Sequence, residues 1–125
     1  MDLKGIQDIL NAKVIIGAGS LGKEINFVYS SDLMSDVLAF VKPGALLLTA
    51  LTNSQVVRTA EIADLSAVCF VCGKEPQEDT LKLAGESGIP LLITNLTMYE
   101  ACGLLFKEGV SHHINSDIKW ILKKD

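Results

Sequence analysis

Three glycines with the spacing of a phosphate-binding loop are the residues most suggestive of chemistry. The run Gly17-Ala-Gly-Ser-Leu-Gly22 directly follows the apolar run Val14-Ile-Ile16. In a dinucleotide-binding fold the last glycine opens a helix, and the free amide groups of that helix hold the pyrophosphate. Here Ile25, Phe27 and Tyr29 alternate with Asn26 and Ser30, with only Val28 breaking the pattern, which indicates a strand. We therefore interpret the glycines as a turn between two strands, since all three suit positive φ angles.

The next strand gives a second reason against dinucleotide binding. Such folds place an acidic residue at the end of the following parallel strand, where it binds the ribose. The corresponding segment, Ala50-Leu-Thr-Asn53, contains no Asp or Glu. An enzyme that uses a dinucleotide is therefore the least supported function, and we expect no cofactor.

A second group of polar side chains follows the ends of three expected strands. Because ligands bind outside the carboxyl ends of parallel strands, these side chains form a candidate ligand rim with one cation. The candidate ligand-binding residues are Ser30, Ser31, Asp32, Thr52, Asn53 and Lys74. Helix capping by Ser31 or Asp32, with ordinary loop chemistry at the other positions, explains the same residues and stays open as the alternative.

The cysteines and histidines predict neither catalysis nor a metal site. Cys69 and Cys72 form a C-x-x-C pattern, but they lie in an apparent buried strand, where residues three apart point to opposite faces. His112 and His113 are adjacent, and adjacent histidines rarely share one metal. The chain lacks the G-x-S-x-G and G-x-x-x-x-G-K-[ST] motifs. We expect no catalytic residue.

The hydrophobic periodicity predicts alternating helices and strands. From residue 45 onward the order is strand, helix, strand, helix, strand, helix, which is typical of a parallel sheet covered by helices. The fold class is therefore α/β, with a mostly parallel, mixed-edge sheet of about five strands flanked by helices. Helices are expected over 2–11, 33–41, 54–64, 77–87 and 97–107, and strands over 13–16, 24–30, 45–50, 67–71 and 89–94. The expected inward side chains of the second and third helices are Leu33, Val37, Leu38, Val41, Val56, Val57, Ala60 and Ile62.

Composition limits the class of protein. The 125 residues suffice for one domain, and 49% hydrophobic with 21% charged residues predicts a folded chain. A net charge of −4 argues against nucleic acid as a partner. Neither a membrane span nor a signal peptide is evident, so we expect a cytoplasmic protein.

The last residues carry a separate apolar stripe. We divide the chain into a domain over 1–110 and a C-terminal tail over 111–125. In the tail, Ile114, Ile118, Ile121 and Leu122 share one side of an expected helix. That side must dock on the domain or on a second subunit, which predicts a homodimer.

Four segments together resemble the DRTGG domain family, most closely its small stand-alone members. They are Tyr29-Ser-Ser-Asp-Leu-Met-Ser-Asp-Val37, Lys42-Pro-Gly-Ala-Leu-Leu-Leu-Thr49, Cys72-Gly-Lys-Glu-Pro76 and the run from Gly88 to Leu92. The resemblance covers roughly residues 3 to 110. The Asp-Arg-Thr-Gly-Gly string itself is absent, and Cys72-Gly-Lys-Glu follows the strand at Val71 instead.

The resemblance implies an α/β fold like the N-terminal domains of HPr kinase and of the Mur ligases. It also implies an accessory role, as in regulated pyrophosphatases, where the domain lies beside CBS domains. We therefore expect a non-catalytic regulatory or ligand-sensing module, nucleotide-related and homodimeric. The alternative is a protein-interaction subunit that docks on an enzyme partner.

Overall fold

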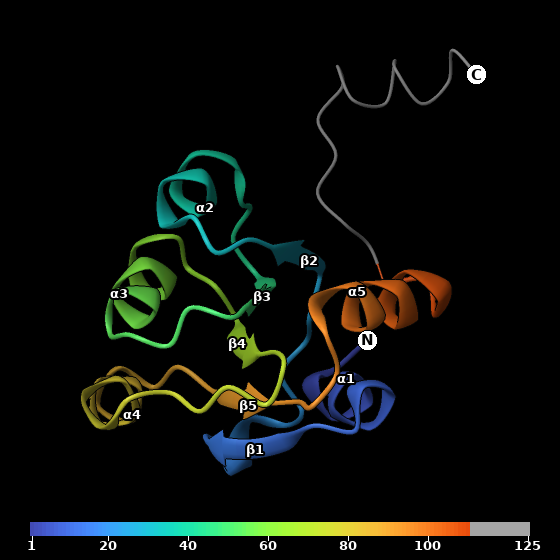
Figure 1. Cartoon of the computed structure of the whole chain (residues 1–125), viewed down its shortest axis with the longest axis horizontal. Coiled ribbons are helices and arrows are strands. Elements are labelled where there is room, and N and C mark those ends of the chain that lie inside the picture. Colours follow the sequence, from blue (N-terminus) through green and yellow to red (C-terminus); the bar gives the residue numbers. More distant parts are fainter. Residues whose placement is uncertain (111–125) are drawn as a thin grey trace.

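The structure is a computed structural model and describes residues 1–110; it places a five-stranded sheet between two layers of helices (Figure 1). Each helix and strand lies within about three residues of its expected range. The helices are α1 (Leu3–Leu10), α2 (Met34–Phe40), α3 (Gln55–Ile62), α4 (Glu78–Ser87) and α5 (Met98–Lys107). The strands are β1 (Lys13–Ile16), β2 (Phe27–Ser30), β3 (Ala45–Thr49), β4 (Ala67–Phe70) and β5 (Leu91–Ile93).

The sheet has the strand order β1-β5-β4-β3-β2. The pairs β2–β3, β3–β4 and β4–β5 are parallel, whereas β1 is antiparallel to β5 at one edge. This arrangement confirms the expected α/β class with a mostly parallel sheet and a mixed edge. All four parallel strands consequently end at the same side of the sheet.

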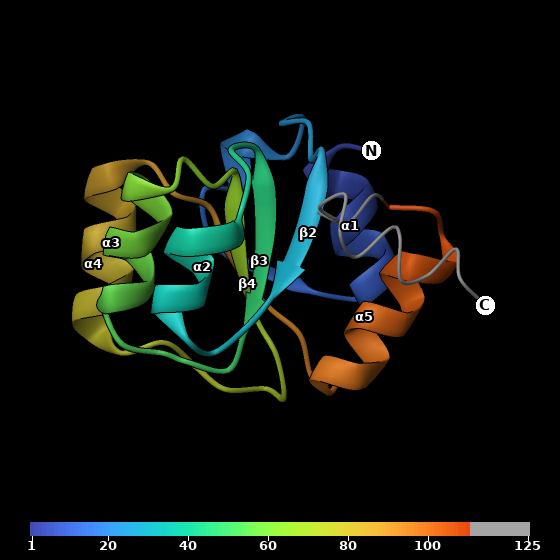
Figure 2. The same cartoon turned by 90° about the horizontal axis from the view of Figure 1, so that it is seen from above.

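Helices cover both faces of the sheet, which explains why the central strands are apolar throughout. Figures 1 and 2 show α1 and α5 on one face and α2, α3 and α4 on the other. Side chains of β3 alternate between the two cores: Leu46 and Leu48 pack with α1 and α5, whereas Ala45 and Leu47 face α2 and α3. Every residue of β3 is buried, as a central parallel strand requires.

The edge strand β1 contains an irregularity that the sequence pattern did not predict. Val14 pairs with Leu92 and Ile16 with Leu91, so Ile15 is an extra residue opposite the regular ladder of β5. A bulge of this kind turns neighbouring side chains away from strict alternation. Ile15 and Ile16 therefore both pack with the α2–α4 core, whereas Val14 packs with the α1–α5 core.

The glycine segment is a turn between strands, and its details correct the sequence interpretation. Of the three glycines in this segment, only Gly17 has a positive φ, of 86°, and a side chain there would lie 3.0 Å from the Pro90 backbone. Gly19 and Gly22 lie outside the positive-φ region, because a 3-10 turn over Ala18–Ser20 carries the chain around. The element that follows Gly22 is the strand β2 and not an α-helix, and β2 begins at Phe27 instead of residue 24.

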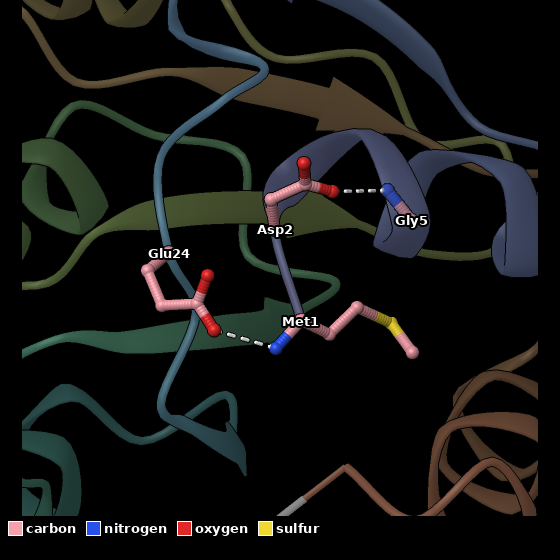
Figure 3. Close-up of polar contacts among 4 residues, drawn as sticks. All are labelled: Met1, Asp2, Gly5 and Glu24. Carbon is pink, nitrogen blue, oxygen red and sulfur yellow. Dashed lines mark hydrogen bonds and ion pairs between the residues drawn. The ribbon is translucent and has the colours of Figure 1, made fainter.

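Contacts with the N-terminus account for the late start of β2. Glu24 and Asp2 form an isolated antiparallel bridge, and the Met1 ammonium lies 2.7 Å from a Glu24 carboxylate oxygen (Figure 3). The Asp2 side chain accepts a hydrogen bond from the Gly5 amide at 2.9 Å and caps α1. The segment before β2 is thus held by the chain start and not by β3.

Three side chains expected to face the core are exposed. Leu33, Leu38 and Ile62 have exposed fractions of 57%, 48% and 74%. In α2, Val37 is buried as expected and Met34 is buried in addition, whereas Leu33 precedes the helix as its N-cap and Leu38 lies about 100° around the helix from Val37. Ile62 is the last residue of α3.

The expected tail helix and its apolar stripe, together with His112 and His113, lie outside the described residues. Among the helices of residues 1–110, none has the length and apolar character needed to span a bilayer.

Candidate functional site

The candidate site is the edge where the four parallel strands end. Ser30 is the last residue of β2, and Ser31 and Asp32 follow it directly. Thr52 and Asn53 follow β3, and Lys74 follows β4. The topology therefore brings all six predicted residues to one edge of the sheet, although it gives them different tasks there.

Asp32 holds the ends of β2 and β3 together. One of its carboxylate oxygens accepts hydrogen bonds from the Thr49 hydroxyl at 2.9 Å and from the Ala50 amide at 2.7 Å. Charge-assisted bonds of this length are among the stronger ones in proteins. The expectation that Asp32 caps the following helix is therefore wrong, because its carboxylate points to the neighbouring strand.

Ser31 also shapes the junction instead of capping α2. Its hydroxyl oxygen accepts a hydrogen bond from the Leu33 amide at 3.0 Å, a local turn over two residues. Leu33 itself occupies the N-cap position of α2 and makes no side-chain cap bond. With Asp36 in the first turn, the start of this short helix repels anions.

The loop after β3 is fastened to the start of α4. The Thr52 carbonyl accepts hydrogen bonds from the Gln77 amide at 3.1 Å and from the Thr80 hydroxyl at 2.8 Å. Asn53 makes a local turn, since its side-chain oxygen accepts from the Gln55 amide at 3.1 Å. These bonds join the loops after β3 and β4 into one rigid surface.

Three of the six side chains keep their polar groups available. Within residues 1–110, the Ser30 hydroxyl, the Thr52 hydroxyl and the Lys74 ammonium take part in no hydrogen bond or ion pair. Ser30 lines a hollow of about 140 Å³ together with α5 residues, on the α1–α5 face. It is thus separated from Thr52, whose loop packs on α4 on the other face.

The segment after β4 adopts an uncommon backbone conformation. Cys72 and Gly73 both have positive φ, of 60° and 63°, and their amides donate to the Leu96 and Thr94 carbonyls at 2.7 and 2.8 Å. This geometry turns the chain sharply and presents Lys74 to solvent. A side chain at Gly73 would meet the Asn95 side chain at 2.8 Å.

The C-x-x-C cysteines are separate free thiols. Cys69 lies in β4 and is buried, whereas Cys72 is exposed beyond the strand end. Burial raises the pKa of the Cys69 thiol to about 12, so it stays protonated and unreactive at neutral pH. The part of the chain that the structure describes has no group of three or more His, Cys, Asp or Glu side chains placed to hold a metal.

Thr49 and Thr94 belong to the polar residues that the sequence places at the strand ends, but they are not among the six candidate ligand residues. Thr49 is fully buried and donates to Asp32, and the buried Thr94 hydroxyl donates to the Leu10 carbonyl at 2.7 Å. The apolar run before each threonine is the signal that indicates burial of its hydroxyl. Their role is to support the edge, since both hydroxyls are used inside the fold.

With this geometry established, comparison with known proteins defines the class. The DRTGG domain family matches residues 5–107, and the chain belongs to this family. No match was found among curated proteins.

One solved structure is similar over nearly the whole chain. It is the crystal structure of the CBS and DRTGG domains of the regulatory region of Clostridium perfringens pyrophosphatase, complexed with its activator, diadenosine tetraphosphate. The likeness has a TM-score of 0.68 at 16% sequence identity, and it covers 98% of this chain. This chain spans only 60% of the length of that one. At this identity the likeness establishes the shared fold.

Proposed function

We propose that this protein is a non-catalytic regulatory module that senses a nucleotide-like ligand at the carboxyl edge of its parallel strands. Membership of the DRTGG family supports a regulatory role, and the similar structure comes from a regulatory region complexed with a nucleotide activator. The observation that carries the proposal is the rigid edge itself, where Thr52 and Lys74 offer a hydroxyl and an ammonium that the fold does not use.

The charges at the edge suit a phosphate near Lys74. The Asp32 carboxylate accepts two hydrogen bonds from the end of β3, which hold it against that strand. Lys74 follows the sharp turn at Cys72 and Gly73 and is exposed, so its ammonium can reach a bound anion. Thr52 can donate its hydroxyl from the adjoining loop, while Ser31, Asp32 and Asn53 hold the backbone in place.

Isothermal titration calorimetry with ATP, AMP and diadenosine tetraphosphate tests the proposal. We expect saturable binding of at least one nucleotide, and we expect Lys74→Ala to weaken it about tenfold, as for one lost charge-assisted hydrogen bond. Lys107→Ala is the matched control, because Lys107 is an exposed lysine in the last turn of α5, outside the candidate residues. Absence of heat with all three nucleotides would overturn the proposal.

A second candidate function is an interaction subunit, favoured by one surface. The exposed apolar side chains Leu33, Leu38 and Phe40 lie in and before α2, next to β2 at the open edge of the sheet. Such a surface suits a homodimer or an enzyme partner. Co-purification of an enzyme with the tagged chain, without any nucleotide binding, would favour this candidate over the first.

A further inference from the structure

A pocket between the edge strand β1 and helix α4 has no part in the predicted site. Its volume is about 250 Å³, and its walls are the aliphatic side chains of Ile15, Ile16, Leu81 and Ile93. In Figure 1, α4 is the last helix on its face, and β1 lies beyond β5 at the edge of the sheet. The pocket therefore occupies the side of β1 that this helix layer covers incompletely.

The bulge in β1 creates the apolar wall. In a regular strand, Ile15 and Ile16 would point to opposite faces of the sheet. Because Ile15 is an extra residue in the pairing with β5, both side chains pack on the α4 face, beside Ile93. Ile15, Ile16, Leu81 and Ile93 all remain partly exposed, which leaves apolar area uncovered in this part of the molecule.

Two opposite charges flank this apolar wall. Lys13 and Glu75 line the pocket and are exposed, and neither takes part in an ion pair or side-chain hydrogen bond with any residue from 1 to 110. An ammonium can donate to a ring nitrogen or carbonyl, and a carboxylate can accept from an exocyclic amino group. Aliphatic walls with one donor and one acceptor suit a flat heterocycle with polar edges.

The size of the pocket limits the ligand to one ring system. Pockets for whole drug-sized molecules have volumes of about 300–1,000 Å³, so 250 Å³ is too small to enclose a complete nucleotide. The remainder of a larger ligand must lie outside. One end of the pocket lies at the candidate edge, because the lining residue Ile93 ends the parallel strand β5 and the lining residue Glu75 directly follows Lys74.

We propose that the β1–α4 pocket is the base subsite of the nucleotide site, with the phosphates extending to Lys74. This inference rests on the proposed function and adds to it the position and chemistry of base recognition. The base packs against Ile15 and Leu81, while Glu75 accepts a hydrogen bond from its amino group and Lys13 donates to its edge. The sequence motif for a dinucleotide loop has no part in this site.

The test uses calorimetry on the full chain with AMP, adenosine and ribose 5-phosphate as probes. Glu75→Gln should weaken AMP and adenosine about tenfold, the loss expected for one hydrogen bond to a charged group, and leave ribose 5-phosphate unchanged. Glu61→Gln is the matched control, since Glu61 is an exposed carboxylate on α3 outside the pocket. Ile15→Trp fills the pocket and should abolish adenosine binding, whereas Ile62→Trp, at an exposed position, should not.

The outcomes separate this inference from the function on which it rests. Equal AMP affinity in the wild-type protein, Glu75→Gln and Ile15→Trp would overturn the base subsite and leave nucleotide sensing intact. No binding of AMP, ATP or diadenosine tetraphosphate to the wild-type protein would overturn both. Because Ile15→Trp can disturb packing, its circular dichroism spectrum must match the wild type. The surface change Glu75→Gln decides the question if it does not.

Discussion

At the scale of single residues, Asp32 shows how a loop carboxylate can organise an entire edge. Its two hydrogen bonds reach Thr49 and Ala50, which belong to the neighbouring strand and its end. The sequence located Asp32 in the candidate site and left two roles open for it, ligand contact or helix capping. The partner hydroxyl is 17 residues away in the sequence, so local patterns could not reveal the pairing.

Replacing Asp32 should therefore destabilise the fold. We expect Asp32→Ala to lower the free energy of unfolding by about 1–2 kcal/mol, because both donors lose a charged acceptor at a partly exposed position. Urea denaturation followed by circular dichroism measures the change. Asp79→Ala serves as control, since Asp79 is exposed on α4 and takes part in no ion pair or side-chain hydrogen bond with a described residue. Equal midpoints for the two variants would refute the role of Asp32.

The buried Cys69 thiol makes the free energy of unfolding depend on pH in the alkaline range. Burial raises its pKa from 9.0 to about 12, so between these values the folded chain holds a proton that the unfolded chain has lost. Stability therefore falls as the pH rises from about 9 to about 12. Replacing the thiol by Cys69→Ala should flatten this decline, whatever its effect at neutral pH. A Cys72→Ala variant, which changes an exposed thiol, should keep the wild-type slope.

At the scale of elements, α5 has a complete capping box. The Thr97 hydroxyl oxygen accepts from the Glu100 amide at 3.2 Å, and the Glu100 side chain accepts from the Thr97 amide at 3.0 Å. The Thr97 amide and, at 3.0 Å, the Thr97 hydroxyl both donate to the Glu100 carboxylate, and these two bonds lower the pKa of the Glu100 carboxyl. The sequence predicted a helix from residue 97, and the structure makes Thr97 the N-cap of a helix that begins at Met98.

Loss of the Thr97 cap should destabilise α5. Thr97→Ala should lower the free energy of unfolding by about 1 kcal/mol, the usual cost of losing an N-cap. Thermal denaturation gives the comparison. Thr52→Ala removes a side chain that has no hydrogen bond to any described residue. The melting temperature of this variant should therefore stay close to that of the wild type. Equal melting temperatures for Thr97→Ala and Thr52→Ala would contradict the capping role of Thr97.

The glycine turn provides a second test at this scale. Gly17→Ala should cost about 1–2 kcal/mol, because its φ of 86° is left-handed and a side chain would lie 3.0 Å from the Pro90 backbone. Gly22→Ala should be nearly neutral, since nothing lies within 4 Å of the position a side chain would take. Chemical denaturation of both variants measures the difference. A larger loss at Gly22 would contradict the structure of the turn.

The elements were predictable where burial repeats in a simple pattern. The run Ala45–Thr49 indicated a strand buried on both faces because every residue in it is apolar or small. The bulge at Ile15 was not predictable, since the four-residue run Lys13–Ile16 contains no signal that distinguishes a bulge from a regular strand. The pocket beside that bulge could not be predicted from the sequence for the same reason.

At the scale of the whole molecule, the distribution of exposed apolar residues bears on assembly. Leu38 and Phe40 of α2 are about half exposed and lie near β2, whose outer edge has no partner strand among the described residues. The sequence predicted a homodimer from the tail, and this surface offers a separate reason for one.

Sedimentation velocity should therefore show a dimer at micromolar concentration. Phe40→Glu should shift the population toward monomer, because a charge would be buried without a partner in the contact. Ile62→Glu places the same charge on α3 at a 74% exposed position and should leave the distribution unchanged. A wild-type monomer at high concentration would rule out the dimer.

The antiparallel pairing of β1 with β5 also has a consequence for how the chain acquires its structure. The first strand pairs with the last strand, the first helix contacts the last helix, and the Thr94 hydroxyl bonds to the Leu10 carbonyl across 84 residues. Contacts between distant parts of a chain form slowly, because a long loop must close first. During synthesis on the ribosome, β1 therefore cannot pair until β5 has left the ribosome. A nascent chain that ends before Leu91 should remain sensitive to protease throughout its first 20 or so residues.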